Sequence, residues 1–388
     1  MFVYLDNSAT TKPYNEVVAE TVKYMDTHYG NPSSLHRMGI AAEKALKEAR
    51  KATSVSLGVK EDEIYFTSGG TEADNTALFG TVQARKRRGN KIITSQIEHP
   101  AVLEGCRKLE ESGFRVEYIP VDRNGIIDMP ALENTMDDQT ILITIMHVNN
   151  EVGAIQPVSE IGELKNRIGE KLGTEILLHS DAVQSYGKLP IQIYDSGIDL
   201  LSVSGHKIHG PKGVGALYVR KGLNVQPYLF GGGQERGLRS GTENVPAIAG
   251  FGIAADLNRR NLTKRIESMR TVKTYLTEGI RSEIQDIRFN STEEGSASIL
   301  NVSFLGVRGE VLLHTLEQSE IYVSTGSACS SRKKGQSHVL KAMELSDKEI
   351  EGAIRFSFCE FNTIAEMDYV LAELKNAVQK IRKLGSYR

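Results

Sequence analysis

The 388-residue chain contains no tryptophan and little cysteine. Its three cysteines, Cys106, Cys329 and Cys359, are too few and too scattered to form the disulfide framework of a small secreted protein. This cysteine usage predicts a reduced, cytoplasmic protein. The absence of tryptophan excludes no class of protein.

Long apolar runs and a strong charge imbalance are also missing. The longest apolar run, residues 141–148, suits a buried strand and is too short to span a membrane. The N-terminus has neither the basic region nor the apolar stretch of a signal peptide. The formal net charge is −2, so we expect neither a membrane nor direct contact with nucleic acid. The length is about right for two domains.

The chain does contain a regular alternation of strand-like and helix-like segments up to about residue 250. Strands are expected at residues 63–66, 91–94, 116–121, 141–148, 175–179, 199–203 and 215–219. Helices are expected at residues 41–57, from about 73, at 101–111 and at 158–171. Buried strands that alternate with helices predict a mostly parallel α/β sheet covered on both faces. In such sheets the ligand lies at the carboxyl ends of the strands.

After about residue 250 the pattern predicts a smaller α+β domain. A long helix at 257–283 is followed by a strand at 298–304, a helix near 310–318 and a C-terminal helix at 364–384. We expect a large domain at residues 14–255. The small domain then comprises residues 1–13 and 256–388, including a loop at about 324–338.

One lysine, Lys207, follows the apolar run 199–203 and precedes a segment rich in glycine and proline. A lysine at the mouth of an α/β sheet suits Schiff-base chemistry, because a desolvated ammonium loses its proton easily. By frequency alone, a lysine on a surface loop is the commoner case. The polar residues at the other strand ends decide between the two.

Three of these strand ends carry residues that a ligand could use. Gly70 and Thr71 precede a helix and could hold an anion, although a simple helix cap explains them equally well. His99 could stack on a ring or transfer protons, or it could be a capping or solvated histidine. Asn150 could bind a polar group, or it could belong to an asparagine-rich turn.

Asp181 follows an apolar strand and therefore needs a cationic partner. A protonated ring nitrogen is one such partner, and a structural ion pair is the alternative. Gln184 falls on the same side of a helical turn. A phosphate cradle, a stacking histidine, a buried aspartate and Lys207 together form the set that pyridoxal 5'-phosphate requires, with further phosphate contacts from Ser204 and His206.

The chain closely resembles the cysteine desulfurases of the NifS/IscS type, within the class V aminotransferase group. The matching motifs lie at residues 4–11, 30–36, 68–72, 98–100, 148–153, 181–184, 204–207, 231–242 and 324–329. The resemblance thus covers essentially the whole chain. It implies the type I, aspartate aminotransferase-like fold of pyridoxal-phosphate-dependent transferases.

The resemblance also implies a role for each matching residue. Lys207 would hold the cofactor as an imine, His99 would stack on its ring and could donate a proton, and Asp181 would bind the ring nitrogen. Gln184 would bind the phenolic oxygen. The phosphate would be held by Gly70, Thr71, Ser204 and His206, and by Thr242 of the other subunit of a homodimer.

Asn150 and Arg355 would hold the substrate carboxylate, Asn150 also lying against the cofactor; a bidentate guanidinium suits this task. Cys329 lies in a small, polar, glycine-bearing segment, which predicts a mobile loop. The neighbouring Arg332, Lys333 and Lys334 favour its thiolate, whereas a buried inert cysteine would need an apolar setting. The length of this segment resembles the long-loop group I of these enzymes.

The predicted function is the conversion of L-cysteine to L-alanine with a persulfide on Cys329. Sulfur would pass to an acceptor protein, either an iron–sulfur scaffold or a tRNA-thiolation protein. No resident metal is expected, although Cys329 could contact a transferred iron–sulfur cluster. The alternatives are a selenocysteine lyase and a class V aminotransferase. A non-catalytic sulfur-assembly platform would not need to retain Lys207, Asp181 and Cys329 together.

Overall fold

The computed structural model describes residues 1–325 and 336–385. Its main feature is a seven-stranded sheet in the order β2-β8-β7-β6-β5-β3-β4. Only β8 runs antiparallel to its neighbours; the other pairs are parallel. The mostly parallel sheet is therefore confirmed, with strands at Ile64–Thr67 (β2), Lys91–Ser95 (β3), Arg115–Ile119 (β4), Thr140–Thr144 (β5), Leu177–Asp181 (β6), Leu200–Ser204 (β7) and Gly215–Val219 (β8).

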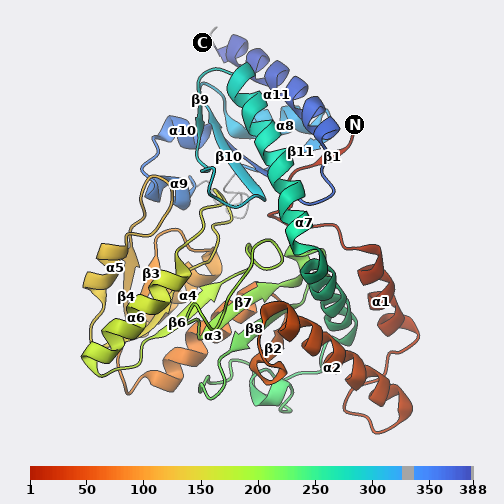
Figure 1. The fold of residues 1–388 in the computed structure, drawn as a ribbon, viewed down its shortest axis with the longest axis vertical. Helices are drawn as coiled ribbons and strands as arrows, with labels where there is room; N and C mark the ends of the chain where they lie inside the picture. The colour runs from red at the N-terminus through yellow and green to blue at the C-terminus, as the bar shows by residue number, and fades with distance from the viewer. Residues whose placement is uncertain (326–335, 386–388) are drawn as a thin grey trace.

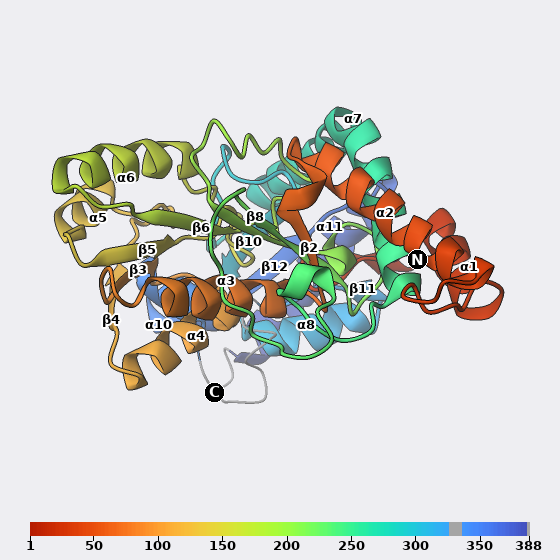
Figure 2. The same cartoon turned by 90° about the horizontal axis from the view of Figure 1, so that it is seen from below.

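Helices cover both faces of this sheet (Figure 2). One face carries α3 (Gly70–Arg85) and α4 (Pro100–Glu111). The other carries α6 (Val158–Leu172) and α2 (Arg37–Leu57), with the short α5 (Met129–Thr135) beside α6. Every residue of β3 and β5 to β8 is buried, as expected for strands enclosed on both sides.

The C-terminal part forms a second, smaller unit that also contains both chain ends (Figure 1). It has an antiparallel sheet in the order β12-β10-β9 and a parallel pair, β1-β11. Val3 and Leu5 of the N-terminus pack into its core with Phe356 and Leu374. The elements are Val3–Tyr4 (β1), Ile287–Phe289 (β9), Ile299–Phe304 (β10), Ile321–Tyr322 (β11), Ala353–Ser357 (β12), Gly309–Glu317 (α8), His338–Ala342 (α9), Asp347–Glu351 (α10) and Ile364–Gly385 (α11).

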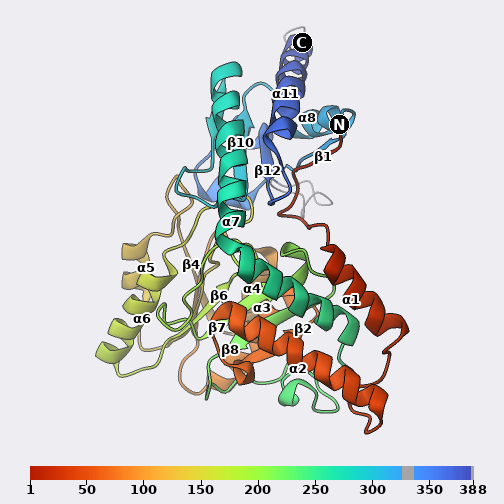
Figure 3. The same ribbon diagram turned by 45° about the vertical axis from the view of Figure 1, so that its right-hand side comes forward.

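Helix α7 (Val245–Glu283) runs through both units (Figures 1 and 3). The sequence predicted its start at residue 257, which was wrong. Its first turns are rich in glycine and alanine because they pack closely on α2, where a Cβ added to Gly252 would lie 2.6 Å from Ala49 Cα. Because these first turns are buried on several sides, their sequence lacks the single apolar stripe of an amphipathic helix. The expected domain boundary at residue 255 falls inside α7 and stays a prediction.

Helix α1 (Asn15–Asp26) was not predicted from the sequence. It packs against α7, and only Val17 and Tyr24 of its residues are buried. Most of its apolar side chains are exposed, so its sequence carries little of the pattern that marks a buried helical face. Although α7 spans 39 residues, no helix within the described part of the chain is long and apolar enough to cross a membrane.

Candidate active site

A cavity of about 270 Å³ lies where the large sheet meets the smaller unit. It opens at the carboxyl ends of β6 and β7 and at the start of α3. It brings together ten of the residues that the sequence selected: Gly70, Thr71, His99, Asn150, Asp181, Gln184, Ser204, His206, Lys207 and Arg355. These residues come from segments far apart in the chain, and the fold brings them to one cavity. Their individual roles stay predictions.

Two other predicted residues are not found in this cavity. Thr242 is exposed in the segment between β8 and α7 and does not line the cavity. Cys329 lies outside the described residues. Both ends of its segment nevertheless reach the cavity region, since Ser324 N donates to the backbone carbonyl of Arg355 at 3.1 Å and His338 lines the cavity wall.

Lys207 ends a short 3₁₀ turn that follows β7 directly. Its Nζ donates to the backbone carbonyls of Ser8 and, at 2.8 Å, of Ala9. The N-terminal segment is further tied to this turn because Thr11 N donates to the His206 carbonyl at 2.9 Å. The N-terminus therefore holds the Lys207 amine at the cavity edge, which no local feature of either segment predicted.

Asp181 is the last residue of β6 and is buried. One of its oxygens, Oδ1, accepts from Val183 N at 2.9 Å. Burial raises the pKa of this carboxyl, and His99 and Lys207 only partly oppose the rise. The hydrogen bond to this carboxyl comes from the backbone, and Lys207 stabilises its charged form, so a structural ion pair and a cofactor contact both stay open. A buried carboxyl group with a raised pKa suits a cationic ligand, which would stabilise its charged form.

A second buried acid, Asp74, stands beside Asp181. Atoms of Asp74, His99 and Asp181 lie within 4.8 Å of one another. Burial and the neighbouring Asp181 carboxyl raise the pKa of Asp74 well above its usual range. Sequence reasoning gave Asp74 no role, although its place one helical turn after Gly70 directs it toward the same cavity.

His99 has both of the properties that the sequence left open. It caps α4, its Nδ1 accepting from Ala101 N at 3.1 Å, and it also lines the cavity. Burial lowers the pKa of the ring, Asp181 opposes that shift, and Lys207 adds to it. A neutral ring held at one edge by a helix cap can offer its flat face to an aromatic ligand.

The two asparagines after β5 differ in their contacts. The expected strand 141–148 ends at Thr144, after which the chain turns toward the cavity. Asn149 forms a turn, its Oδ1 accepting from the backbone N–H of Glu151 at 2.9 Å and of Val152 at 3.0 Å. Asn150 lies in this turn and also lines the cavity. The turn interpretation therefore holds for Asn150, and its ligand-binding role stays a prediction.

Arg355 of β12 is fixed in the cavity wall by two hydrogen bonds. It donates from Nη2 to Asp6 Oδ1 at 2.8 Å and from Nη1 to the Asn150 carbonyl at 2.9 Å. Its Nε is buried without a hydrogen-bond partner among the described residues. A rigid guanidinium with donor capacity to spare suits an anionic ligand group.

Glu151 is a further buried acid that the sequence did not identify. Burial raises its pKa to about 7, while the Ser337 hydroxyl and Arg355 oppose the rise. Ser337 Oγ donates to its Oε2 at 2.6 Å. This contact anchors the start of α9, and with it the chain that follows the Cys329 segment, to the cavity wall.

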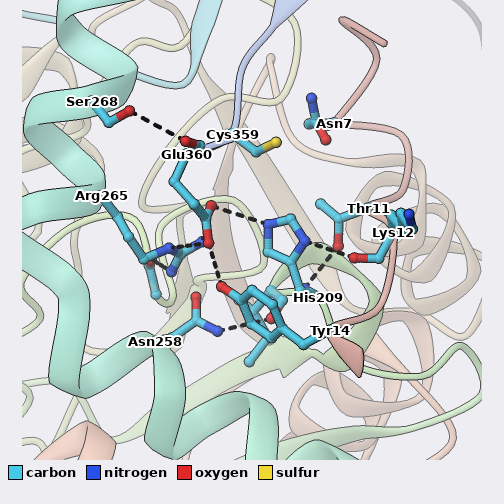
Figure 4. Close-up of polar contacts among 12 residues, drawn as sticks. Asn7, Thr11, Lys12, Tyr14, His209, Asn258, Arg265, Ser268, Cys359 and Glu360 are labelled. Atoms are coloured by element: carbon cyan, nitrogen blue, oxygen red, sulfur yellow. Dashed lines mark hydrogen bonds and ion pairs between the residues drawn. The ribbon is translucent and has the colours of Figure 1, made fainter. Parts of the chain in front are cut away.

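A buried polar cluster around Glu360 supports the turn that carries Lys207 (Figure 4). Glu360 Oε1 pairs with Arg265 Nε of α7 at 2.9 Å, and its Oε2 lies 3.3 Å from His209 Nε2. Tyr14 also donates to this carboxylate. Burial alone would raise the pKa of Glu360, but His209 and Arg265 hold it well below its usual range. The cluster ties α7, the N-terminal segment and the residues after Lys207 together.

The two described cysteines are packing residues. Cys106 is buried among apolar side chains between α3 and α4, and burial raises its pKa to about 12. Cys359 is 8% exposed, and burial raises its pKa to about 11. Neither thiol is poised to ionise near neutral pH.

The cavity fits pyridoxal phosphate. Asp181 supplies a buried carboxylate for the ring nitrogen, and Lys207 supplies an amine at the opposite edge. The backbone at the start of α3 can approach a phosphate closely, because a Cβ at Gly70 would lie 2.8 Å from Val183 Cγ2 and no larger residue fits there. Ser8 Oγ and Arg355 Nε are further buried polar atoms without partners among the described residues.

The fold is the type I fold of pyridoxal-phosphate-dependent transferases, with its cavity between a large α/β sheet and a smaller α+β unit. Within that class, the chain belongs to the aminotransferase class-V family, whose model matches residues 3–370.

Known relatives and solved structures resemble the chain over nearly its whole length. It is 44% identical over 383 residues to the cysteine desulfurase IscS of Methanosarcina thermophila, covering 99% of this chain and 93% of that protein. It is 41% identical to the cysteine desulfurase IscS of Dictyoglomus turgidum, covering 100% and 97%. The structure of a NifS-like protein superimposes with a TM-score of 0.91 at 40% identity, covering 98% and 100%. The structure of SspA in complex with cysteine gives 0.82 at 35% identity, covering 93% and 100%.

Proposed function

We propose that this chain is a pyridoxal-phosphate-dependent cysteine desulfurase that converts L-cysteine to L-alanine and transfers the sulfur. The observation that carries the proposal is that Lys207 and Asp181 line the same cavity. The whole-length similarity to proteins named cysteine desulfurase supports it. L-Cysteine as the substrate is also supported by the similar SspA structure, which was solved with cysteine.

In this proposal, each residue that binds the cofactor contacts a defined part of it. Pyridoxal phosphate, when bound, supplies an electron sink for the Cα of the amino acid. Asp181 holds the ring nitrogen, His99 covers the ring, and Gln184 binds the phenolic oxygen. The phosphate is held by Gly70, Thr71, Ser204 and His206, with Thr242 reaching it from the partner subunit.

Substrate binding and proton transfer fall to four residues. Arg355 and Asn150 hold the carboxylate of cysteine, and so direct its Cα toward Lys207. The Lys207 amine then removes the Cα proton, a task that suits an amine in a partly desolvated site. His99 is placed to return a proton to the product, because it lies in the same cavity as Lys207.

Cys329 receives the sulfur in this proposal. Its thiolate attacks the sulfur of the bound cysteine, a sulfur–sulfur bond forms, and the Cβ–S bond of the substrate breaks. The electron pair of that bond remains on the substrate carbon, which takes up protons and leaves as L-alanine. The persulfide on Cys329 then passes its outer sulfur to an acceptor, either an iron–sulfur scaffold or a tRNA-thiolation protein.

The protein would act as a cytoplasmic homodimer. The chain resembles long-loop desulfurases, in which the loop carries sulfur away from the cavity. Thr242 does not line the cavity of its own chain, which supports a role at the partner subunit. Exposed apolar side chains on α1 and at residues 228–230 are available for the dimer contact. The two described cysteines are free thiols, which fits a reducing compartment.

A product assay with purified protein and L-cysteine tests the proposal. Wild-type protein with pyridoxal phosphate and a thiol reductant is expected to release alanine and sulfide in equal amounts without any keto acid. Cys329→Ala is expected to lose sulfide release, while Cys359→Ala keeps it, because Cys359 is a packing residue. Alanine formation that requires a keto acid would instead identify an aminotransferase, and a strong preference for selenocysteine would identify a lyase.

A further inference from the structure

Lys188 is a buried lysine to which the proposed reaction gives no task. It lies in the turn after β6 and is only 3% exposed. Its Nζ donates to Gln184 Oε1 at 3.1 Å. Across residues 1–325 and 336–385, no carboxylate forms an ion pair with it. Burying an ammonium without a carboxylate is costly, so packing alone does not explain this residue.

The charges around Lys188 are mostly of its own sign. Burial, with smaller effects from Lys207, Arg265 and Arg355, lowers its pKa to about 7, while Cys359 opposes the shift. The charge of Arg265 is already compensated by Glu360 (Figure 4). Lys188 is linked to Lys207 through Gln184, whose amide nitrogen and the Lys207 amine donate to the same Ser8 carbonyl.

The contact with Lys188 fixes which way the Gln184 amide faces. An ammonium has no acceptor, so the amide atom that meets it must be the carbonyl oxygen. The amide nitrogen then donates to the Ser8 carbonyl at 2.9 Å, the same carbonyl that accepts from Lys207. Gln184 also lines the cavity, so its NH₂ group is the part left to serve a ligand.

The backbone around Lys188 is held rigidly. Gly187 has a φ of 69°, and a Cβ there would lie 2.9 Å from Asn258 Oδ1, so this tight turn requires glycine. Arg265 Nη1 donates to the Gly187 carbonyl at 2.6 Å. Helix α7 therefore clamps the turn that directs Lys188 into the interior.

We propose that Lys188 is a positioning residue for the cofactor: it orients Gln184 as a donor into the cavity and sets a second ammonium beside Lys207. This inference rests on the proposed function and deepens it. A positive charge near Lys207 disfavours a second positive charge on the nitrogen that joins Lys207 to the cofactor. Lys188 therefore lowers the pH at which the bound cofactor changes its protonation and its colour.

A spectrophotometric pH titration of the full-length, cofactor-loaded protein tests this inference. Lys188→Met removes the charge and the donor, so the midpoint of the visible band should rise by about 1 pH unit. Lys188→Arg keeps the charge at every pH, so its midpoint should fall below that of the wild type. Lys273→Met is the matched control, because Lys273 is also buried but donates to the Ser296 carbonyl at 2.9 Å, outside the cavity. Its midpoint should stay at the wild-type value.

Unchanged midpoints in both Lys188 variants, or an equal shift in Lys273→Met, would overturn the inference. If Lys188→Met does not fold, Lys188→Gln replaces it, since glutamine keeps a donor but carries no charge. Borohydride reduction followed by peptide mapping separates this outcome from failure of the proposed function. A wild-type protein without a cofactor adduct on Lys207 contradicts the proposed function, whereas a normal adduct with unmoved midpoints contradicts only the role of Lys188.

Discussion

At the scale of single residues, buried polar groups that lack a full set of partners mark the cavity. Asp181 accepts one backbone hydrogen bond, and burial raises its pKa despite His99 and Lys207. Arg355 keeps a buried Nε without a partner among the described residues. Such groups are costly unless a ligand completes them, which is why they mark the binding site rather than the core.

Asp181→Asn is expected to weaken cofactor binding by about 100- to 4000-fold, because removing one partner of a buried charge pair costs about 3 to 5 kcal/mol. Cofactor affinity can be measured from the visible absorbance on titrating the apoprotein. Asp26→Asn, at the exposed end of α1, is the control and should bind as the wild type does. Wild-type affinity in Asp181→Asn would show that this carboxylate does not hold the ring.

The sequence predicted Lys207, His99 and Asp181 because each follows an apolar strand, where a polar residue is conspicuous. It did not predict Lys188 or Glu151. These two are ordinary charged residues in turns, and their importance comes only from burial against segments that are distant in the chain. Local sequence carries no signal for such burial.

At the scale of elements, α7 and the Glu360 cluster connect the two units. The start of α7 was predicted twelve residues too late, because its first turns are buried on several sides and show no amphipathic stripe. Helix α1 was missed because its apolar residues are largely exposed. The buried strands, by contrast, were predicted within a few residues, since continuous apolar runs are a strong local signal.

Glu360→Gln is expected to lower the free energy of unfolding at pH 7 by about 3 kcal/mol, because it leaves Arg265 and His209 buried without their carboxylate. The pKa of Glu360 is depressed in the folded protein. The contribution of Glu360 to the free energy of unfolding is therefore complete above the ordinary carboxyl pKa. It is lost as the pH falls from that value toward the lower pKa of the folded protein. Thermal unfolding should show a large difference from the wild type at pH 7 that shrinks below about pH 4.

The control for this experiment is Glu133→Gln, which removes an exposed ion pair with Arg167. Exposed pairs contribute little, so its unfolding temperature should remain close to that of the wild type. A Glu360→Gln variant that is destabilised as strongly at about pH 3 as at pH 7 would contradict the assignment of a charged Glu360.

At the scale of the whole molecule, the type I fold and the class V family were recognised from motifs spread along the chain. In the structure, residues from several of these motifs line one cavity. Thr242 is the exception, because it is exposed and away from the cavity of its own chain. A dimer with shared active sites would account for its position, and no single-chain pattern can place a residue in a neighbouring subunit.

Subunit mixing tests the shared site. Lys207→Ala and Thr242→Asp are each expected to be inactive, the first without the cofactor lysine and the second through repulsion of the phosphate. If Thr242 acts on the partner subunit, a mixed dimer contains one site with both residues intact and regains desulfurase activity. No recovery after mixing, with mixed dimers confirmed by differently tagged chains, would show that Thr242 does not act on the site of the partner subunit.

The central claim is that Lys207 and Cys329 act together to take sulfur from cysteine. Mass spectrometry of the cofactor-loaded protein after brief exposure to L-cysteine, without reductant, tests it most directly. We predict a gain of one sulfur atom, mapped to the peptide containing Cys329, together with one equivalent of alanine; Lys207→Ala should show neither. Alanine release with no sulfur on Cys329, or sulfur on Cys329 in the Lys207→Ala variant, would contradict the account.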